Sequence, residues 1–190
     1  MNNCLILDGK EVAQTSSESL IARIKKLNNH GRPPKLVAIL VGDDPASATY
    51  VTMKERACHS LGIETEIKRL AKDTSTTELQ QIIKDLNNDQ TVDGILLQHP
   101  VPKQIDEIKC FNTICIEKDV DGVTTEGFGN MAMGLNAFGS CTPLGIMRIL
   151  DHYKINLEGM NALVIGRSQI LGKPMAAMLL NANATVTIAF

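Results

Sequence analysis

Tyr50 and Lys54 form the first candidate catalytic pair along the chain. They are four residues apart in a stretch with helical spacing, so a phenol and an ammonium lie on one helix face. A lysine that is held near a tyrosine and partly withdrawn from water can act in proton transfer. The alternative is a solvated lysine whose aliphatic stem is covered by the tyrosine ring. The pattern alone leaves both interpretations open.

Two further segments carry polar groups that could face a ligand. Gln98 follows the apolar stretch 92–97, and the prolines at 100 and 102 could stiffen the exit and aim its amide into a cleft. The alternative is a plain strand terminator. Asp119 and Asp121 flank Val120, and paired carboxylates could hold a protonated ring nitrogen or an amino group. The alternative here is a simple Asp-Gly turn.

Residues 166–172 form a glycine-bounded turn between a predicted strand and a predicted helix. A dinucleotide phosphate binds in such a context, near main-chain N–H groups and a helix N-terminus. The spacing departs from G-x-G-x-x-G, so an ordinary strand-to-helix turn is the alternative. Arg167 and Ser168 would suit an adenosine 2′-phosphate. The acidic residue that would favour NAD is expected about 20 residues past the glycines, beyond Phe190.

The elements that must position these residues alternate between short apolar runs and longer amphipathic ones. The patterns predict helices over 16–27, 45–60 and 76–86 and strands over 5–7, 36–41, 63–70 and 92–97. Strands linked by helices form a parallel α/β sheet. Ligands bind at the carboxyl ends of such strands, here residues 42–44 and 98–102.

The second part of the chain has a different character. Residues 121–141 are rich in glycine and are expected to form a long loop. Thr142 is the expected N-cap of a helix over 144–153, and a strand (163–165), a helix (174–180) and a strand (185–188) follow. We therefore expect domains at 1–140 and 141–190. The second is too small to bury both faces of its sheet, which suggests a C-terminally truncated form of a longer protein.

Composition excludes several classes of protein. The 190 residues include 44% hydrophobic and 21% charged residues, and the net charge of -2 offers no basic field for nucleic acid. No apolar run approaches the roughly 20 residues that span a bilayer, and the N-terminus lacks a basic signal-peptide region. The cysteines match no disulfide framework or zinc pattern, which favours reduced thiols in a cytoplasmic protein without a metal site: Cys4, Cys58, Cys110, Cys115 and Cys141.

Taken together, five motifs occur in an order and at distances that indicate a known family. They are Tyr50 with Lys54, Gln98-x-Pro-x-Pro, Lys118-Asp-Val-Asp-Gly, Thr142-Pro-Leu-Gly, and Gly166-Arg-Ser-x-x-x-Gly-x-Pro. Over its whole length the chain resembles the bifunctional methylenetetrahydrofolate dehydrogenase/methenyltetrahydrofolate cyclohydrolase family.

The resemblance implies an α/β fold with two functional parts. Residues 1–140 would form the folate-binding catalytic domain, and 141–190 a linker helix and the start of a Rossmann-like NADP-binding domain. The implied activity is NADP-dependent oxidation of 5,10-methylenetetrahydrofolate to 5,10-methenyltetrahydrofolate and its hydrolysis to 10-formyltetrahydrofolate. That activity belongs to one-carbon metabolism and purine biosynthesis. The resemblance also implies a cytoplasmic homodimer with tetrahydrofolate substrates and without nucleic-acid or membrane partners.

The resemblance also implies roles for individual residues. Lys54 would be the central residue for hydrolysis, Gln98 would hydrogen-bond it, and Tyr50 would stack on the folate ring. Asp121 would anchor the pterin. The cofactor-binding set would be Gly166, Arg167, Ser168, Gly172 and Pro174.

Three departures from the family pattern leave other interpretations open. Residues 123–127 read Val-Thr-Thr-Glu-Gly where many members carry His-Pro-Leu-Asn, His99 stands where leucine is more usual, and members continue well beyond residue 190. One alternative is a folate-binding fragment without turnover, because its cofactor half is incomplete. Another is a different two-domain NAD(P)-dependent dehydrogenase.

Overall fold

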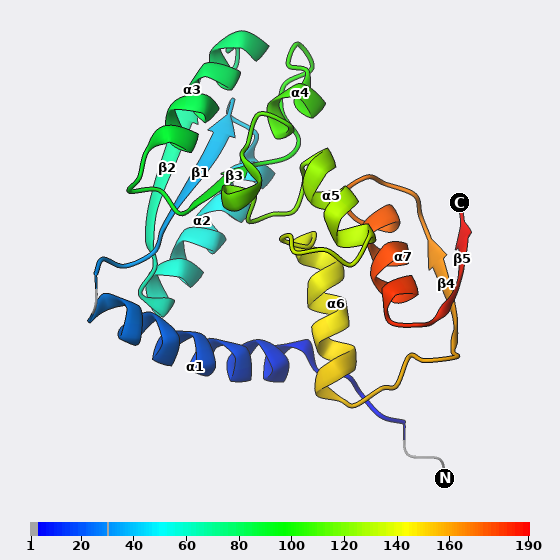
Figure 1. The fold of residues 1–190 in the computed structure, drawn as a ribbon. Coiled ribbons are helices and arrows are strands. Elements are labelled where there is room, and N and C mark those ends of the chain that lie inside the picture. Colours follow the sequence, from blue (N-terminus) through cyan, green and yellow to red (C-terminus); the bar gives the residue numbers. More distant parts are fainter. Residues whose placement is uncertain (1–3, 30) are drawn as a thin grey trace.

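The computed structural model describes residues 4–29 and 31–190, which form two α/β regions joined by a helix (Figure 1). In the first region, the helices are α1 (Gly9–Asn28), α2 (Pro45–Leu61), α3 (Thr76–Asn88), α4 (Glu107–Phe111) and α5 (Thr125–Ala132), and the strands are β1 (Lys35–Val41), β2 (Glu64–Leu70) and β3 (Gly94–Leu97). A 3-10 turn covers Ile116–Lys118. The joining helix α6 (Cys141–His152) is followed by β4 (Asn161–Ile165), α7 (Gly172–Asn181) and β5 (Thr185–Ala189).

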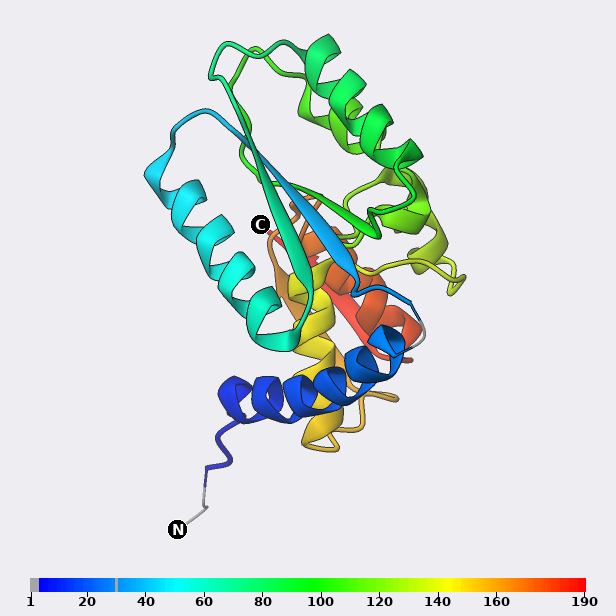
Figure 2. The ribbon, with the colours of Figure 1, turned by 90° about the vertical axis from the view of Figure 1, so that its left-hand side faces the viewer.

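The first region is built on a parallel three-stranded sheet with the order β2-β1-β3. Helices α2 and α3 lie on opposite sides of its strands (Figure 2). Alternate residues of β1 therefore enter different cores: Val37 and Ile39 pack with Ile83 of α3, whereas Leu40 packs with Val51 of α2. Burial on both faces explains why β1 and β3 are continuous apolar runs, as the sequence predicts.

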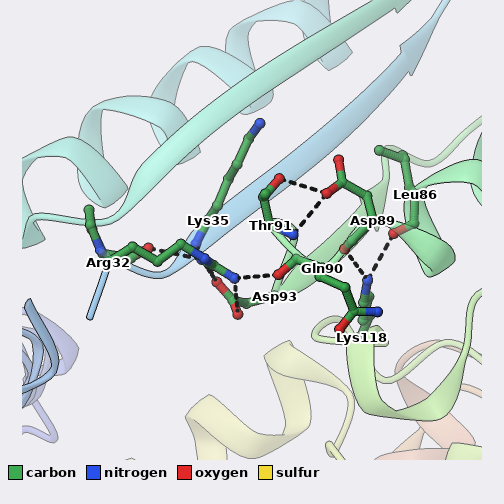
Figure 3. Close-up of polar contacts among 9 residues, drawn as sticks. Arg32, Lys35, Leu86, Asp89, Gln90, Thr91, Asp93 and Lys118 are labelled. Carbon is green, nitrogen blue, oxygen red and sulfur yellow. Dashed lines mark hydrogen bonds and ion pairs between the residues drawn. The ribbon is translucent and has the colours of Figure 1, made fainter. Parts of the chain in front are cut away.

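The amino end of this sheet is held by a dense polar network (Figure 3). Asp93, just before β3, accepts two hydrogen bonds from the Arg32 guanidinium, at 2.6 and 3.0 Å, and one from the Lys35 main-chain N–H at 2.8 Å. The Lys118 ammonium donates to the main-chain oxygens of Leu86, Asn87 and Asp89 at 2.7–2.9 Å, which satisfies carbonyls at the end of α3.

The second region consists of the parallel pair β4 and β5 packed against α7. Val164 and Met175 belong to its core. The opposite face of the pair is open, and Leu163 and Ile165 of β4 are 61% and 80% exposed. The predicted strand–helix–strand order is confirmed, and the two strands pair in parallel.

Helix α6 connects to the first region through α1. The Tyr153 hydroxyl accepts a hydrogen bond from the Asp8 main-chain N–H at 2.9 Å and donates to the Glu11 carboxylate at 3.1 Å. Helix α6 stands between the two regions in Figure 1. Across residues 4–29 and 31–190, no helix has both the length and the apolar character needed to cross a membrane.

The strand predicted over residues 5–7 is wrong. This segment belongs to no helix or strand, and Leu5 and Ile6 are 65% and 77% exposed. An apolar triplet needs a neighbouring strand to become part of a sheet, and the described chain provides none there. Instead, the Asp8 carboxylate accepts the Lys10 N–H at 2.8 Å and starts α1 earlier than predicted.

The predicted long loop over 121–141 is wrong in part, because it contains α5. Thr124 caps this helix by accepting the Gly127 N–H at 3.0 Å, a signal concealed by the surrounding glycines. The next helix also begins earlier than predicted, with Ser140 rather than Thr142 at its N-cap position. The Ser140 hydroxyl instead donates to the Ile170 carbonyl at 2.5 Å and ties the helix start to the second region.

Candidate functional site

The structure brings Lys54 and Gln98 together at the carboxyl end of the sheet. Helix α2 begins just after β1, and Gln98 comes directly after the neighbouring strand β3. The Lys54 ammonium donates a hydrogen bond to Gln98 Oε1 at 3.3 Å. Gln98 is buried, and its main-chain N–H donates to the Ile39 carbonyl at 2.9 Å, which extends the strand pairing to this residue. The amide therefore stands on a rigid element.

Tyr50 lies one turn before Lys54 on α2, as the four-residue spacing predicts. Its side chain is 61% exposed, whereas Lys54 is half-buried. The aromatic ring is thus accessible to a ligand. The helix starts at Asp44, whose carboxylate accepts the Ser47 N–H at 2.7 Å and whose pKa this bond lowers.

The two neighbouring carboxylates have different environments. Asp119 is 1% exposed and accepts main-chain hydrogen bonds from Val123 at 3.1 Å and Thr124 at 2.9 Å. It shapes the following loop and is not free to bind a ligand. Asp121 is only half-buried. Gly122 has a φ of 65°, and a Cβ there would collide with the backbone of Gly139, so the chain turns sharply after Asp121.

Cys141, which the sequence interpretation treated only as a reduced thiol, lies against the Asp119–Asp121 segment. Its thiol donates to the Val120 carbonyl at 3.4 Å. Burial of the Cys141 thiol raises its pKa to about 12, the Asp121 carboxylate adds to this rise, and the Lys54 charge opposes it. Cys141 therefore lies within electrostatic reach of both Lys54 and Asp121. Its position beside the Thr142-Pro143 motif was the only signal in the sequence.

The predicted phosphate-binding turn joins β4 to α7. Gly166 has a φ of 127°, and a Cβ on Gly172 would collide with the Gly166 carbonyl, so both glycines are required for this turn. Ser168 Oγ accepts the Gly172 N–H at 3.2 Å. The Arg167 guanidinium lies 3.7 Å from the centre of the Phe190 ring, and its residue is exposed. Pro174 is buried in the first turn of α7, where proline is well tolerated.

A separate cavity of about 210 Å³ lies where the first region meets the turn before α7. Phe111 and Phe128 line it from one side, and Gln169 and Lys173 from the other. The described residues around it include none of the four predicted catalytic residues. The site around Lys54 is therefore defined by its side chains at the sheet edge and not by this cavity.

Two family models match the chain. The model for the catalytic domain of tetrahydrofolate dehydrogenase/cyclohydrolase matches residues 7–121, and the model for its NAD(P)-binding domain matches residues 140–190. The chain belongs to the tetrahydrofolate dehydrogenase/cyclohydrolase family. The resemblance derived from the five motifs is thereby confirmed, as is the mixed α/β class with parallel sheets.

Individual members of the family are similar over nearly the whole chain. It is 56% identical to the bifunctional protein FolD of Shouchella clausii over 97% of this chain and 66% of the relative. It is 57% identical to that of Acidobacterium capsulatum over 98% of this chain and 67% of the relative. The chain thus spans about two thirds of the length of these relatives.

Solved structures of the family share the arrangement of both regions. The bifunctional enzyme FolD from Campylobacter jejuni matches with a TM-score of 0.96 at 42% identity, covering 97% of this chain and 66% of that one. The Trypanosoma brucei family member complexed with NADP cofactor and an inhibitor matches with a TM-score of 0.93 at 28% identity, covering 100% of this chain and 65% of that one. The NAD-dependent methylenetetrahydrofolate dehydrogenase of Saccharomyces cerevisiae matches with a TM-score of 0.84 at 28% identity, covering 96% of this chain and 63% of that one.

Proposed function

We propose that this protein oxidises 5,10-methylenetetrahydrofolate with NADP and hydrolyses the resulting methenyl cation to 10-formyltetrahydrofolate. The observation that carries this proposal is the 3.3 Å contact between Lys54 and Gln98 at the carboxyl end of the sheet, with Tyr50 exposed one turn away. An amine and an amide that meet beside an accessible aromatic ring suit a flat, cationic intermediate. Family membership supplies the substrate class.

Lys54 would assist the oxidation by being neutral and the hydrolysis by accepting a proton. Loss of a hydride from the methylene carbon leaves a cation, which a nearby positive charge would destabilise. Gln98 Oε1 accepts an N–H from Lys54, so a neutral Lys54 would direct its lone pair away from the amide. That lone pair can take a proton from the water that attacks the methenyl carbon, in general base catalysis.

Asp121 would anchor the pterin through the N–H groups of its ring and amino substituent. A half-buried carboxylate can accept two such bonds, and charge assistance makes them stronger than neutral ones. Asp119 would act indirectly, because the hydrogen bonds that it accepts from Val123 and Thr124 shape the loop that follows Asp121. This division supports the role predicted for Asp121.

The turn before α7 fits a dinucleotide phosphate. Ser168 Oγ accepts the Gly172 N–H at the start of α7, and nothing lies within 4 Å of a Cβ built on Gly166, which leaves the backbone there open to a phosphate. Arg167 and Ser168 would hold the adenosine phosphates, with Gly166, Gly172 and Pro174 shaping the turn. NADP, when bound, supplies the hydride acceptor. Arg167 is an exposed residue whose guanidinium could pair with the 2′-phosphate that only NADP carries, which favours NADP over NAD.

Domain limits, assembly and compartment belong to the same proposal. We place the folate-binding catalytic domain at 1–140 and the linker helix with the start of the NADP-binding domain at 141–190. The unpaired state of all five cysteines supports a cytoplasmic location. The proposal also includes a homodimer that acts on small-molecule folates, without nucleic-acid or membrane partners.

Folate binding without turnover is a second candidate, and one observation favours it. The face of β4 that bears Leu163 and Ile165 is open, so the nucleotide region described here presents an uncovered apolar surface. Under this second candidate, the first region would bind folate but no hydride would be transferred.

Three measurements on one preparation would distinguish these candidates. A folate analogue is titrated by calorimetry, cofactor reduction is followed with NADP and with NAD, and loss of the methenyl absorbance reports hydrolysis. The proposal predicts binding, NADP reduction and hydrolysis, whereas binding alone indicates the second candidate. Arg167→Ala should reduce NADP use more than NAD use, and Arg69→Ala, an exposed arginine of β2, is the matched control. Absence of folate binding would contradict both candidates.

A further inference from the structure

The side-chain amide of Gln98 has one defined orientation. Its Nε2 donates a hydrogen bond to the His99 main-chain carbonyl at 2.7 Å. A carbonyl oxygen can only accept, so the amide nitrogen must face it and Oε1 must point the other way, toward Lys54. The position of the His99 carbonyl therefore determines whether Lys54 meets an acceptor or a donor.

The segment that carries this carbonyl is held from outside the sheet by Glu107. Glu107 Oε1 lies 2.7 Å from His99 Nδ1 and accepts the Val101 N–H at 3.2 Å. One carboxylate oxygen thus contacts the residues on both sides of Pro100. Because a carboxylate only accepts, His99 Nδ1 carries the hydrogen in this contact.

Glu107 itself stands on a well-anchored element. It is the first residue of α4, whose Cys110 and Phe111 are buried in the core beneath the sheet. Asp106 caps this helix by accepting the Lys109 N–H at 3.1 Å. The glutamate side chain is 25% exposed, so its two contacts are only partly open to water.

We infer that Glu107 is a positioning residue that fixes the amide of Gln98 for its contact with Lys54. The inference rests on the proposed function, since the orientation matters only if Lys54 takes part in the reaction. It assigns a purpose to His99, which departs from the leucine expected at this position. The His99 ring gives Glu107 a second anchor beside the Val101 main chain.

Kinetics of the full chain test this role. Glu107→Ala should lower kcat for methenyl hydrolysis about three- to tenfold, with little change in KM, because the hydrogen bonds of the carboxylate to His99 and Val101 are lost while Lys54 and Gln98 remain. Glu107→Gln should restore kcat to within about twofold, since its amide oxygen can accept from both Val101 and His99. Lys109→Gln is the control: it removes an exposed ion pair from the same helix without contacting the 98–101 segment.

A double-mutant cycle separates positioning from general destabilisation. If Glu107 acts through Gln98, Glu107→Ala has no further effect on kcat once Gln98→Ala is present. Additive losses in kcat, or equal losses in Glu107→Ala and Lys109→Gln, would overturn the inference.

NMR tests the same inference without relying on turnover. The side-chain amide resonances of Gln98, identified by their absence in Gln98→Ala, should be shifted and protected from exchange in the unmodified chain and in Glu107→Gln. In Glu107→Ala they should move to the positions of exposed glutamines. Resonances that are unchanged in Glu107→Ala would overturn the inference. A fixed amide in a chain without hydrolysis would instead contradict the proposed function and leave the orientation intact.

Discussion

Polar groups at the two ends of the three-stranded sheet differ in how fully they are hydrogen-bonded. At the amino end, Asp93 accepts three hydrogen bonds, and the Lys118 ammonium donates three (Figure 3). At the carboxyl end, the half-buried Lys54 ammonium has a single hydrogen bond of 3.3 Å within the described chain. Polar groups with a full set of protein partners stabilise the fold, whereas a group with spare capacity can bind something else.

This contrast predicts a separation of effects. Variants at the carboxyl end should lose activity while keeping the free energy of unfolding. Variants at the amino end should lose stability while each folded molecule keeps its activity. A protein in which both ends behaved alike would contradict the assignment of the site.

The largest expected effect is that of Lys54→Met. The substitution keeps the length of the side chain and removes the amine, so methenyl hydrolysis should fall by about a hundredfold or more, the range of general acid–base catalysis. The midpoint of thermal unfolding, followed by circular dichroism, should stay close to that of the unmodified chain. Near-normal hydrolysis would show that Lys54 is a solvated surface lysine.

Asp121→Ala should have the next largest effect, on affinity. A carboxylate that accepts charge-assisted hydrogen bonds contributes about 1.5–3 kcal/mol for each, so the dissociation constant of a folate analogue should rise about tenfold or more. Asp119 is unsuitable as a control because it supports the loop. Asp151→Ala, at an exposed position of α6, serves instead. An unchanged dissociation constant would mean that Asp121 only begins a turn.

Lys118→Met tests the amino end of the sheet. Lys118 belongs to the same sequence motif as Asp121 but is expected to act on stability. Its ammonium donates to three main-chain oxygens at the end of α3, so its loss should lower the free energy of unfolding by about 1–2 kcal/mol. Urea unfolding measures this change. The kcat for hydrolysis should change by less than about twofold, because no contact of Lys118 reaches the site. A larger loss of kcat than of stability would break the proposed separation of the two ends.

The smallest expected effect is the pH-dependent loss of stability in Asp93→Asn. The Arg32 side-chain hydrogen bond and the Lys35 main-chain N–H hold the pKa of the Asp93 carboxyl below its ordinary value of 3.8. A lowered pKa in the folded state means that the ionised carboxylate adds stability above pH 3.8 and loses it as the pH falls through the folded-state value.

At neutral pH, the loss of the Asp93 charge should lower the free energy of unfolding by about 1 kcal/mol, because its exposure to water weakens the contacts. The difference between the unmodified chain and Asp93→Asn should shrink as the pH falls below 3.8. Urea unfolding across this range, with Asp73→Asn as an exposed control, measures it. A constant difference at all pH values would rule out the ionised contact as its source.

Much of the local structure could be predicted from the sequence. The apolar runs at β1 and β3, the spacing of Tyr50 and Lys54, and the glycines of the turn before α7 indicate their structures because each depends on residues close together in the chain. One error came where a neighbour was required, because the 5–7 segment has no strand to pair with. The other, the missed helix α5, came where the glycine-rich composition concealed a local signal, the N-cap Thr124.

The parallel α/β elements, the five motifs and the family to which they belong follow from the order of the amino acids alone. Which side chains meet depends on the three-dimensional packing. It paired Lys54 with Gln98 across 44 positions, buried Asp119 while leaving Asp121 accessible, and brought Glu107 against the segment after β3. The physical reason is that a side chain's partners depend on where whole helices and strands pack. Packing depends on contacts between residues that are far apart in the sequence, and no local pattern contains that information.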